Sequence, residues 1–577
     1  MPVGNWLVLL VALAIVGLDL ALRSPWTGPP VLVLMLLVVL AVAERVRQLV
    51  VQPRTAAVAG QPAGWLSGVL WFEGSLLVAL LGFAVARFFV VLQMFSPTVG
   101  DAASRAGAAQ TYDLVFTVLA LLAGGLVIAP ERSGRALLHL AQRPAVLLAG
   151  SFAVLIAVGS LLLTLPLSVT RFAHISYVDS LFTMASAVCV TGLAVNDVPS
   201  TYTLFGQGVI LAGIQLGGIG IMTIAALALT FSRNTSLQSQ LRYAAMLDAR
   251  TLADLRRIVV GIIAGTFIIE AIGALALWLM FTGDPRLGEA SALWMAVFHA
   301  ISAFCNAGFS LFPGGLTGFI GDPGVQTVIM LLITLGGLGF TVLAALWLKL
   351  RGKSGRQSLQ TRVVLITSLG LTIGGMLLYA VTEWDASLHA LPSVGEKLLN
   401  ALFQSVSLRT AGFNTLDYGG LEHSTILMMI VWMFIGASPG STGGGIKTTT
   451  FAVLLAAIPA LLRNQGRALL LRRTIPHDII YRAATIMTLA TMLAVLVIFL
   501  LLSTHSLPFD KVIFETVSAL ATVGLSLGAT AELDAFGKWA IVMTMFIGRV
   551  GPVSLALALG TPRQTQVSFP EAKLMVG

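Results

Sequence analysis

Residues 403–413 read FQSVSLRTAGF, and three other segments of the chain repeat this pattern. The copies are FTMASAVCVTGL at 182–193, FHAISAFCNAGF at 298–309 and FETVSALATVGL at 514–525. In each copy a serine follows a phenylalanine by four residues, and a glycine follows that serine by six residues, or by five in 403–413. Each copy lies between two long hydrophobic segments. The sequence therefore predicts four units, each made of an outer helix, a short pore helix, a glycine turn and an inner helix.

The composition is that of an integral membrane protein. The mean hydropathy is +0.94, 57% of the residues are hydrophobic and only 10% are charged, which excludes a soluble globular chain. Apolar runs recur that are long enough to cross a hydrocarbon core about 30 Å thick. Backbone polar groups in lipid must be satisfied internally, and these runs are therefore expected to be helices.

The predicted fold is all-α: four tandem helix–pore-helix–helix repeats around a central pore, preceded by about four extra N-terminal transmembrane helices. Half-length re-entrant helices are tolerated at membrane depth only where protein or water covers them, so four of them imply a central cavity. The expected regions are the N-terminal helices at 1–130, repeats at 144–230, 255–349, 362–461 and 480–560, and a cytoplasmic C-terminal tail at 561–577.

The basic residues predict the orientation in the membrane. Of the 34 Lys and Arg residues, 23 fall in six segments that alternate with the hydrophobic spans, as the positive-inside rule requires. We therefore expect a multi-pass protein of the cell (plasma or inner) membrane with both termini in the cytoplasm. The net charge of +9 reflects this topology and contact with anionic membrane lipid, and nucleic acid is not an expected partner.

The glycine turns are candidate ion ligands. A dehydrated cation needs a ring of oxygens in place of its water, and backbone carbonyls supply it. Glycine reaches the φ/ψ values that turn successive carbonyls inward, and the negative C-terminal ends of the pore helices favour a cation. The alternative is that these glycines serve helix packing or capping. The candidate selectivity filter comprises Val190, Thr191, Gly192, Leu193, Asn306, Ala307, Gly308, Phe309, Thr410, Ala411, Gly412, Phe413, Thr522, Val523, Gly524 and Leu525.

A second feature is the segment 436–447, which reads GASPGSTGGGIK. Five glycines and a proline cannot remain a regular helix, so the third inner helix is predicted to break into a flexible gating loop. A phosphate-binding loop is disfavoured, because Ile446 separates the last glycine from Lys447. The candidate gate residues are Gly436, Gly440, Gly443, Gly444, Gly445, Lys447 and Arg549.

Arg549 is a permanent cation inside an apolar helix, where charge is expensive and usually functional. Three roles are open: pairing with a carboxylate, bonding the carbonyls of the broken third helix, or repelling the permeant ion. Snorkelling to the interface is the structural alternative. Arg409, beside the third glycine turn, could brace that turn or face the outer vestibule. Since we find no nucleophile–base set and no metal-site spacing, we expect no enzymatic activity.

The segments 407–415, 438–448 and 548–552, together with the chain end from Phe569, resemble the Trk/Ktr/HKT potassium transporter superfamily. The resemblance implies potassium uptake through one pore per chain, with K⁺ as the permeant ion, no cofactor, and K⁺ sites at Gly192, Gly308, Gly412 and Gly524. It also implies that 436–447 and Arg549 form an intramembrane gate. Homodimers, and a cytosolic ring of nucleotide-binding regulatory subunits, are the partners it implies.

Two other functions stay open. A coupled secondary transporter for Na⁺ or a small solute also uses broken helices at the membrane midplane, although inverted two-fold repeats are expected there. The second open function is that of the pore subunit of an ATP-driven potassium pump. The 548–552 element and the C-terminal segment favour the Trk/Ktr branch, and copurification with a pump-like ATPase chain would favour the pump.

Overall fold

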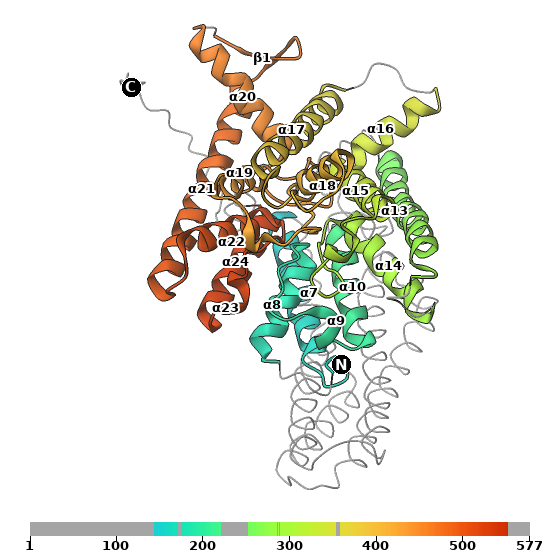
Figure 1. The fold of residues 1–577 in the computed structure, drawn as a ribbon. Coiled ribbons are helices and arrows are strands. Elements are labelled where there is room, and N and C mark those ends of the chain that lie inside the picture. The colour runs from blue at the N-terminus through green and yellow to red at the C-terminus, as the bar shows by residue number, and fades with distance from the viewer. Residues whose placement is uncertain are drawn as a thin grey trace, which may run out of the picture.

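The computed structural model describes residues 144–170, 175–220, 252–284, 287, 289–352, 358–464 and 466–551. The chain is predominantly helical in this part (Figure 1), in agreement with the helical membrane protein that the composition indicates. The helices expected within 1–130 and the tail at 561–577 lie outside the described residues. The region boundaries given above stay predictions.

The helices fall into four groups, each with a first helix, a shorter helix that precedes a repeated glycine, and one or more helices after that glycine. The first group is α7 (Pro144–Leu163), α8 (Tyr177–Cys189), α9 (Val198–Thr201) and α10 (Leu204–Ile219). The second group is α13 (Leu252–Phe281), α14 (Glu289–Cys305), a 3-10 turn (Thr317–Phe319), α15 (Pro323–Leu338) and α16 (Phe340–Leu350).

The C-terminal half repeats this order. The third group is α17 (Leu359–Glu383), α18 (Val394–Ser407), a 3-10 turn (Tyr418–Gly420), α19 (His423–Phe434) and α20 (Thr448–Leu462). A hairpin of β1 (Ala468–Leu470) and β2 (Arg473–Ile475), paired antiparallel, follows it. The fourth group is α21 (His477–Thr504), α22 (Phe509–Ala521), α23 (Ala529–Glu532) and α24 (Ala535–Val550).

Length and composition identify candidate membrane spans among the described helices. Among the described residues, Val260–Phe281, Leu359–Glu383 and His477–Thr504 are long and apolar enough to span. A fourth candidate span is the pair α15 and α16, which is bent by 106°. The bend falls at Gly339, whose φ of +93° ends α15, because an α-helix requires negative φ. The short helices α8, α14, α18 and α22 are not among the candidate spans.

The four short helices are buried in a similar way, and two of them share a serine N-cap. Ser176 caps α8 and Ser393 caps α18, each accepting a hydrogen bond from the backbone N–H three residues on. The repeated phenylalanine of each helix has no exposed surface: these are Phe182, Phe298, Phe403 and Phe514. Removing such a ring typically costs 3–5 kcal/mol. The repeated pattern therefore encodes a packed core as well as a turn.

The groups pack in a closed cycle. Each helix that follows a turn packs on the short helix of the next group: α10 on α14, α15 on α18, and α19 on α22. The last of them, α24, returns to pack on α8 (Figure 1). The ion pair between Lys538 Nζ and Asp179 Oδ1, 2.7 Å long, joins the fourth group to the first. The C-terminal ends of the short helices are thereby brought around one centre.

Candidate functional site

Each short helix ends in a turn with an unusual backbone. The residue two positions before each repeated glycine has positive φ: +58° at Val190, +61° at Asn306, +67° at Thr410 and +52° at Thr522. The glycines also have positive φ, between +71° at Gly308 and +99° at Gly192. Positive φ is rare for a β-branched residue such as valine or threonine. Four turns with this same strained backbone, in four separate segments, indicate a shared purpose.

The four glycines form a ring, which we call the glycine ring (Gly192, Gly308, Gly412 and Gly524). A methyl group on Gly192 would lie 2.5 Å from the carbonyl oxygen of Ala307, and one on Gly308 would lie 2.7 Å from that of Ala411. Methyl groups on Gly412 and Gly524 would collide with the carbonyl oxygens of Val523 and Thr191. Each glycine thus abuts the carbonyl that precedes the next glycine, and the fourth closes on the first.

The repeated serines hold these turns in place. Ser186 Oγ accepts a hydrogen bond from Gly192 N at 3.0 Å, and Ser518 Oγ accepts one from Gly524 N at 3.1 Å. In the other two turns the serine donates instead to the carbonyl of the residue after the glycine: Ser302 to Phe309 at 2.8 Å, and Ser407 to Phe413. Sequence reasoning recorded these serines as part of the pattern but assigned them no role. Their recurrence five or six residues before each glycine was the available signal.

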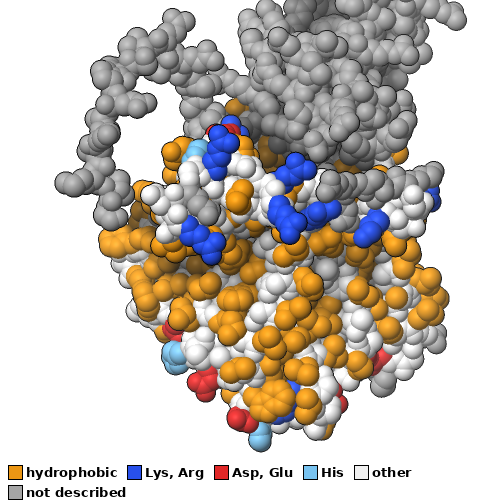
Figure 2. Space-filling view, turned by 90° about the horizontal axis from the view of Figure 1, so that it is seen from above, with side chains coloured by type: hydrophobic (Ala, Val, Ile, Leu, Met, Phe, Trp, Pro, Cys, Tyr) orange, Lys and Arg blue, Asp and Glu red, His pale blue; other side chains and the backbone are white. Residues whose placement is uncertain are grey.

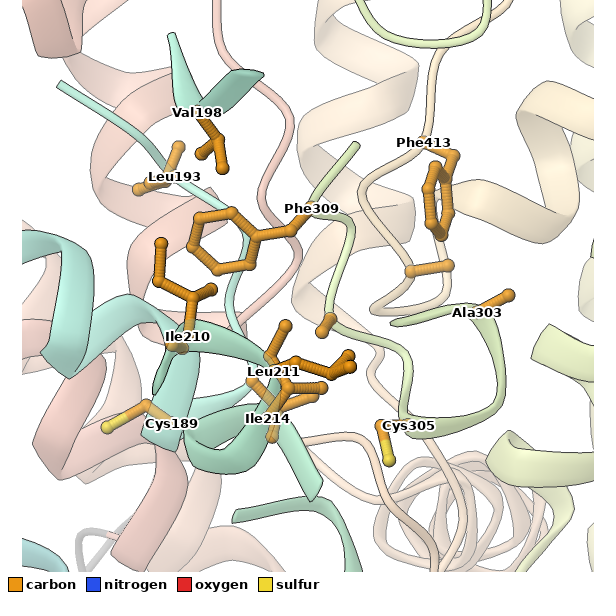
Figure 3. Close-up of a cluster of buried hydrophobic side chains, with 14 of the residues drawn as sticks. Cys189, Leu193, Val198, Ile210, Leu211, Ile214, Ala303, Cys305, Phe309 and Phe413 are labelled. Atoms are coloured by element: carbon orange, nitrogen blue, oxygen red, sulfur yellow. The ribbon is translucent and has the colours of Figure 1, made fainter. Parts of the chain in front are cut away.

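The residues after the ring glycines anchor each turn to the preceding group. Phe309 extends from its turn toward Leu193 and Ile210 of the first group (Figure 3), and all three belong to one buried cluster. In the same way, the Phe413 ring lies 6.5 Å from the His299 ring of α14, centroid to centroid. The apolar residues Leu193, Phe309, Phe413 and Leu525 are buried. Their contribution is packing around the ring.

Residues 436–447 form a loop between α19 and α20, as the glycines and the proline require. A parallel bridge between Ile435 and Ile446 brings the two ends of the loop together. The far part of the loop reaches the end of α15, where Ser438 N donates to Gly337 O at 3.1 Å and Thr442 N to Gly336 O at 3.3 Å. The loop is therefore fixed to the helix that bends at Gly339.

The same loop lies directly against the turns that carry the glycine ring. Thr442 Oγ1 bonds Phe304 O and Asn306 Oδ1, both at 3.2 Å. A methyl group on Gly443 would collide with Thr410 Oγ1, and one on Gly444 with Thr522 Oγ1. Glycine at 443 and 444 is what lets the loop backbone approach these threonines.

Two cations hold the loop. Lys447 Nζ donates to Gly443 O at 2.8 Å and to Gly444 O at 3.3 Å. Arg549 donates to Thr442 O and to Gly217 O, linking the loop to the end of α10. Of the roles considered for Arg549, the structure shows carbonyl bonding. Carbonyl bonds supply acceptors to this partly buried guanidinium without a carboxylate partner.

Three further charged residues are buried: Arg409, Glu270 and Glu515. Arg409 donates to Ser368 O and Oγ on α17, at 3.4 and 3.1 Å, so it braces the third turn. Glu270 accepts a hydrogen bond from Gln215 at 3.1 Å, and Glu515 accepts one from Ser526 at 2.7 Å. Neutral donors thus satisfy both acids.

A cavity of about 210 Å³ lies beside the loop. Its walls come from the loop end, α20, α21, α22 and α24, and both Lys447 and Arg549 line it. Lys447 and Arg549 make part of the cavity wall polar, and Leu520 and Ala490 make another part apolar.

The chain matches known proteins over most of its length. A family model described as TrkH, cation transport protein, matches residues 149–566. The chain is 39% identical over 440 residues to Ktr system potassium uptake protein B of Bacillus subtilis (strain 168), covering 75% of this chain and 97% of that protein. It is also 34% identical over 442 residues to potassium/sodium uptake protein NtpJ of Enterococcus hirae. This match covers 75% of this chain and 97% of that protein.

A solved structure shares the fold. The potassium transporter TrkH from Vibrio parahaemolyticus superimposes with a TM-score of 0.61 at 18% identity, covering 85% of this chain and 96% of that one. At this identity the likeness concerns the fold.

Proposed function

Because the chain belongs to the TrkH family of cation transport proteins, which are transporters and integral membrane proteins rather than enzymes, we propose that it takes up potassium. The proposed path for K⁺ runs through the glycine ring. The relatives named as potassium uptake proteins support this substrate. The proposed architecture is four repeats around one pore.

The closed order of the glycine ring is the observation that carries the proposal. The carbonyls that abut the ring glycines come from Thr191, Ala307, Ala411 and Val523, one from each group. Four neutral oxygens from four chain segments can replace the water of a monovalent cation. The negative ends of α8, α14, α18 and α22 add a favourable potential there. We therefore assign the sixteen turn residues as the selectivity filter, with K⁺ bound at the ring.

The loop at 436–447 is the proposed gate. It is bonded to α15, to the second turn and to Arg549, so it closes the pore on one side of the ring while those bonds persist. The proposed gate residues are the five loop glycines, Lys447 and Arg549. Release of the loop into the neighbouring cavity would open the path.

The surface supports a membrane orientation with the loop side in the cytoplasm. Figure 2 shows a broad belt of hydrophobic side chains between an edge with Lys and Arg and an opposite edge with Asp, Glu and His. Arg351, Arg472 and Arg473 are exposed beyond one end of the helices, and Glu422 and Glu532 beyond the other. The positive-inside rule places the basic edge in the cytoplasm of the cell membrane.

The names of the relatives also support a proposal for the partners of this chain. The relatives' names describe a Ktr system, which supports a separate regulatory subunit. We propose a homodimer that binds a cytosolic ring of nucleotide-binding subunits through the basic edge, with lipid around the belt. The chain itself would need no cofactor.

Flux into liposomes tests the proposal. The purified chain is reconstituted alone, a voltage is imposed, and uptake of rubidium and sodium is followed. We expect rubidium entry without ATP. Sodium uptake alone would contradict potassium selectivity. Substrate accumulation that requires a sodium gradient would favour the coupled transporter, and uptake only with an ATPase partner would favour the pump.

A further inference from the structure

We propose that four buried polar side chains, which we call the brace residues, position the segments that follow the ring glycines and thereby contribute to ion selectivity. We call these segments the outer arms. The brace residue of each group directly follows the repeated phenylalanine of the short helix: Thr183, His299, Gln404 and Glu515. The inference rests on the proposed function, because the arms affect selectivity only if ions pass through the glycine ring.

The brace residues share their place in the pattern and their burial. Each lies one position after a repeated phenylalanine that is itself fully buried, and none exposes more than 1% of its own surface. A buried polar side chain without a partner typically costs about 1–3 kcal/mol. A polar residue at all four equivalent positions therefore calls for a partner in each group.

In the second group the brace residue is a histidine of fixed tautomer. His299 Nδ1 lies 2.8 Å from Met295 O, and because a carbonyl only accepts, Nδ1 carries a proton. His299 Nε2 accepts a hydrogen bond from Leu311 N at 3.3 Å, and Ser310 Oγ lies 3.0 Å from it. These two residues are the second and third after Gly308, so the imidazole holds the arm where it leaves the glycine ring.

In the third group the brace residue bonds the arm at two points. Gln404 Nε2 donates to Thr415 Oγ1 at 3.2 Å, and Gln404 Oε1 accepts from the hydroxyl of Tyr418. Thr415 Oγ1 in turn donates to Asn400 Oδ1 at 2.8 Å. Thr415, the third residue after Gly412, is therefore tied to α18 by two hydrogen bonds.

In the fourth group the brace residue is an acid that accepts two hydrogen bonds. Ser526 Oγ donates to Glu515 Oε2 at 2.7 Å, and the hydroxyl of Thr530 donates to Glu515 Oε1. Ser526 Oγ also accepts from Gly528 N at 2.9 Å, where the arm turns with a φ of +89°. Ser526 is the second residue after Gly524, so Glu515 holds this arm directly beyond the glycine ring.

The partners of the brace residues follow a spacing of their own. In three groups a hydroxyl residue stands eleven positions after the brace residue: these are Ser310, Thr415 and Ser526. In the first group that position is Ala194, which has no hydroxyl. There Tyr202, further along the chain, reaches back and donates to Thr183 Oγ1 at 3.1 Å. The brace position is thus polar and bonded to its arm in all four groups.

The brace residues hold each turn at the end that lies away from the loop. Figure 3 shows Leu193, Phe309 and Phe413, which follow ring glycines, on the opposite side from Cys189 and Cys305, which precede them. An arm that loosens lets the turn before it shift. The field strength and flexibility of a carbonyl cage decide between potassium and sodium. Loss of a brace should therefore weaken ion discrimination.

The bond between Tyr202 and Thr183 offers the sharpest test, because phenylalanine and valine remove its two ends with little change in shape. The rubidium-to-sodium uptake ratio is measured in liposomes under an imposed voltage for Thr183→Val, Tyr202→Phe and the double variant. We expect the ratio to fall at least threefold in each single variant. The double variant should fall no further, because all three lose the same bond.

Two control variants separate the hydroxyl from the volume of the side chain. Thr183→Ser keeps the hydroxyl and should retain the unmodified ratio. Thr516→Val removes another buried threonine hydroxyl, one without a hydrogen-bond partner among the described residues, and should also leave the ratio unchanged. Thr415→Val against Thr415→Ser repeats the comparison in the third group, where the same contrast is expected.

An unchanged ratio in Thr183→Val and Tyr202→Phe would overturn the proposal even if both variants melt at lower temperature, because the bond would then serve stability alone. An equal fall in Thr183→Ser would also overturn it, and no contrast at Thr415 would contradict a role shared by the groups. If Thr183→Val does not fold, Tyr202→Phe removes the same bond from its other end. Failure of the proposed function would show differently, as rubidium uptake indifferent to Gly412→Ala.

Discussion

Valine and threonine seldom adopt positive φ, yet Val190, Thr410 and Thr522 all do, each two residues before a ring glycine. Strain of this kind typically costs 1–3 kcal/mol per residue and persists only where the surroundings enforce it. Here the enforcing contacts are the serine bonds to the turns and the buried apolar residue after each glycine. The single-residue features of the site therefore serve one geometry.

Replacing Gly192 with serine should raise sodium permeability relative to rubidium. A Cβ at this position would lie 2.5 Å from Ala307 O, and the φ of +99° disfavours any side chain. The ring must shift, and the carbonyl cage changes in size and field strength. The measurement is the rubidium-to-sodium uptake ratio in liposomes. An unchanged ratio would remove Gly192 from the filter.

Replacing Ser186 with alanine should loosen the first turn. Gly192 N, which is partly buried, then loses its acceptor, at a cost of about 1 kcal/mol for a lost hydrogen bond. We expect a lower melting temperature together with a lower rubidium-to-sodium uptake ratio. Ser503→Ala is the control, because Ser503 is exposed and bonds only its own helix. Equal effects in both variants would contradict a positioning role for Ser186.

At the scale of elements, the loop between α19 and α20 is the centre of the polar contacts. It bonds α15, the second turn and, through Arg549, the end of α10. Such contacts join segments more than a hundred residues apart, and no local pattern encodes them. The loop's irregularity follows from its glycines and proline, whereas its docking depends on the assembled fold.

Replacing Arg549 with glutamine should raise basal rubidium uptake severalfold. The shorter, neutral side chain cannot reach both Thr442 O and Gly217 O, so the loop loses a link to α10. Uptake by the reconstituted chain without regulatory subunits is the measurement. Arg351→Gln, at an exposed cation after α16, provides the comparison. A rate equal to that of the unmodified chain would count against Arg549 as a gate residue.

At the scale of the molecule, the sequence predicted a helical membrane protein from its composition. It also predicted the four turns, because the repeated residues determine local structure directly. It did not predict the cyclic order in which each group packs on the next, since that order depends on long-range helix packing. The opposite uses of Ser186 and Ser302, one accepting and one donating, were equally hidden. Identical residue types at identical spacing cannot distinguish these two roles.

The most direct test of the ion path compares two glycine-to-alanine changes in the third group. At Gly412 a Cβ would collide with Val523 O, whereas at Gly370, on α17, it would meet nothing within 4 Å. Rubidium uptake is measured in liposomes under an imposed voltage. If the glycine ring is the ion path, Gly412→Ala abolishes rubidium uptake and Gly370→Ala leaves it intact. Full uptake by folded Gly412→Ala protein would contradict it.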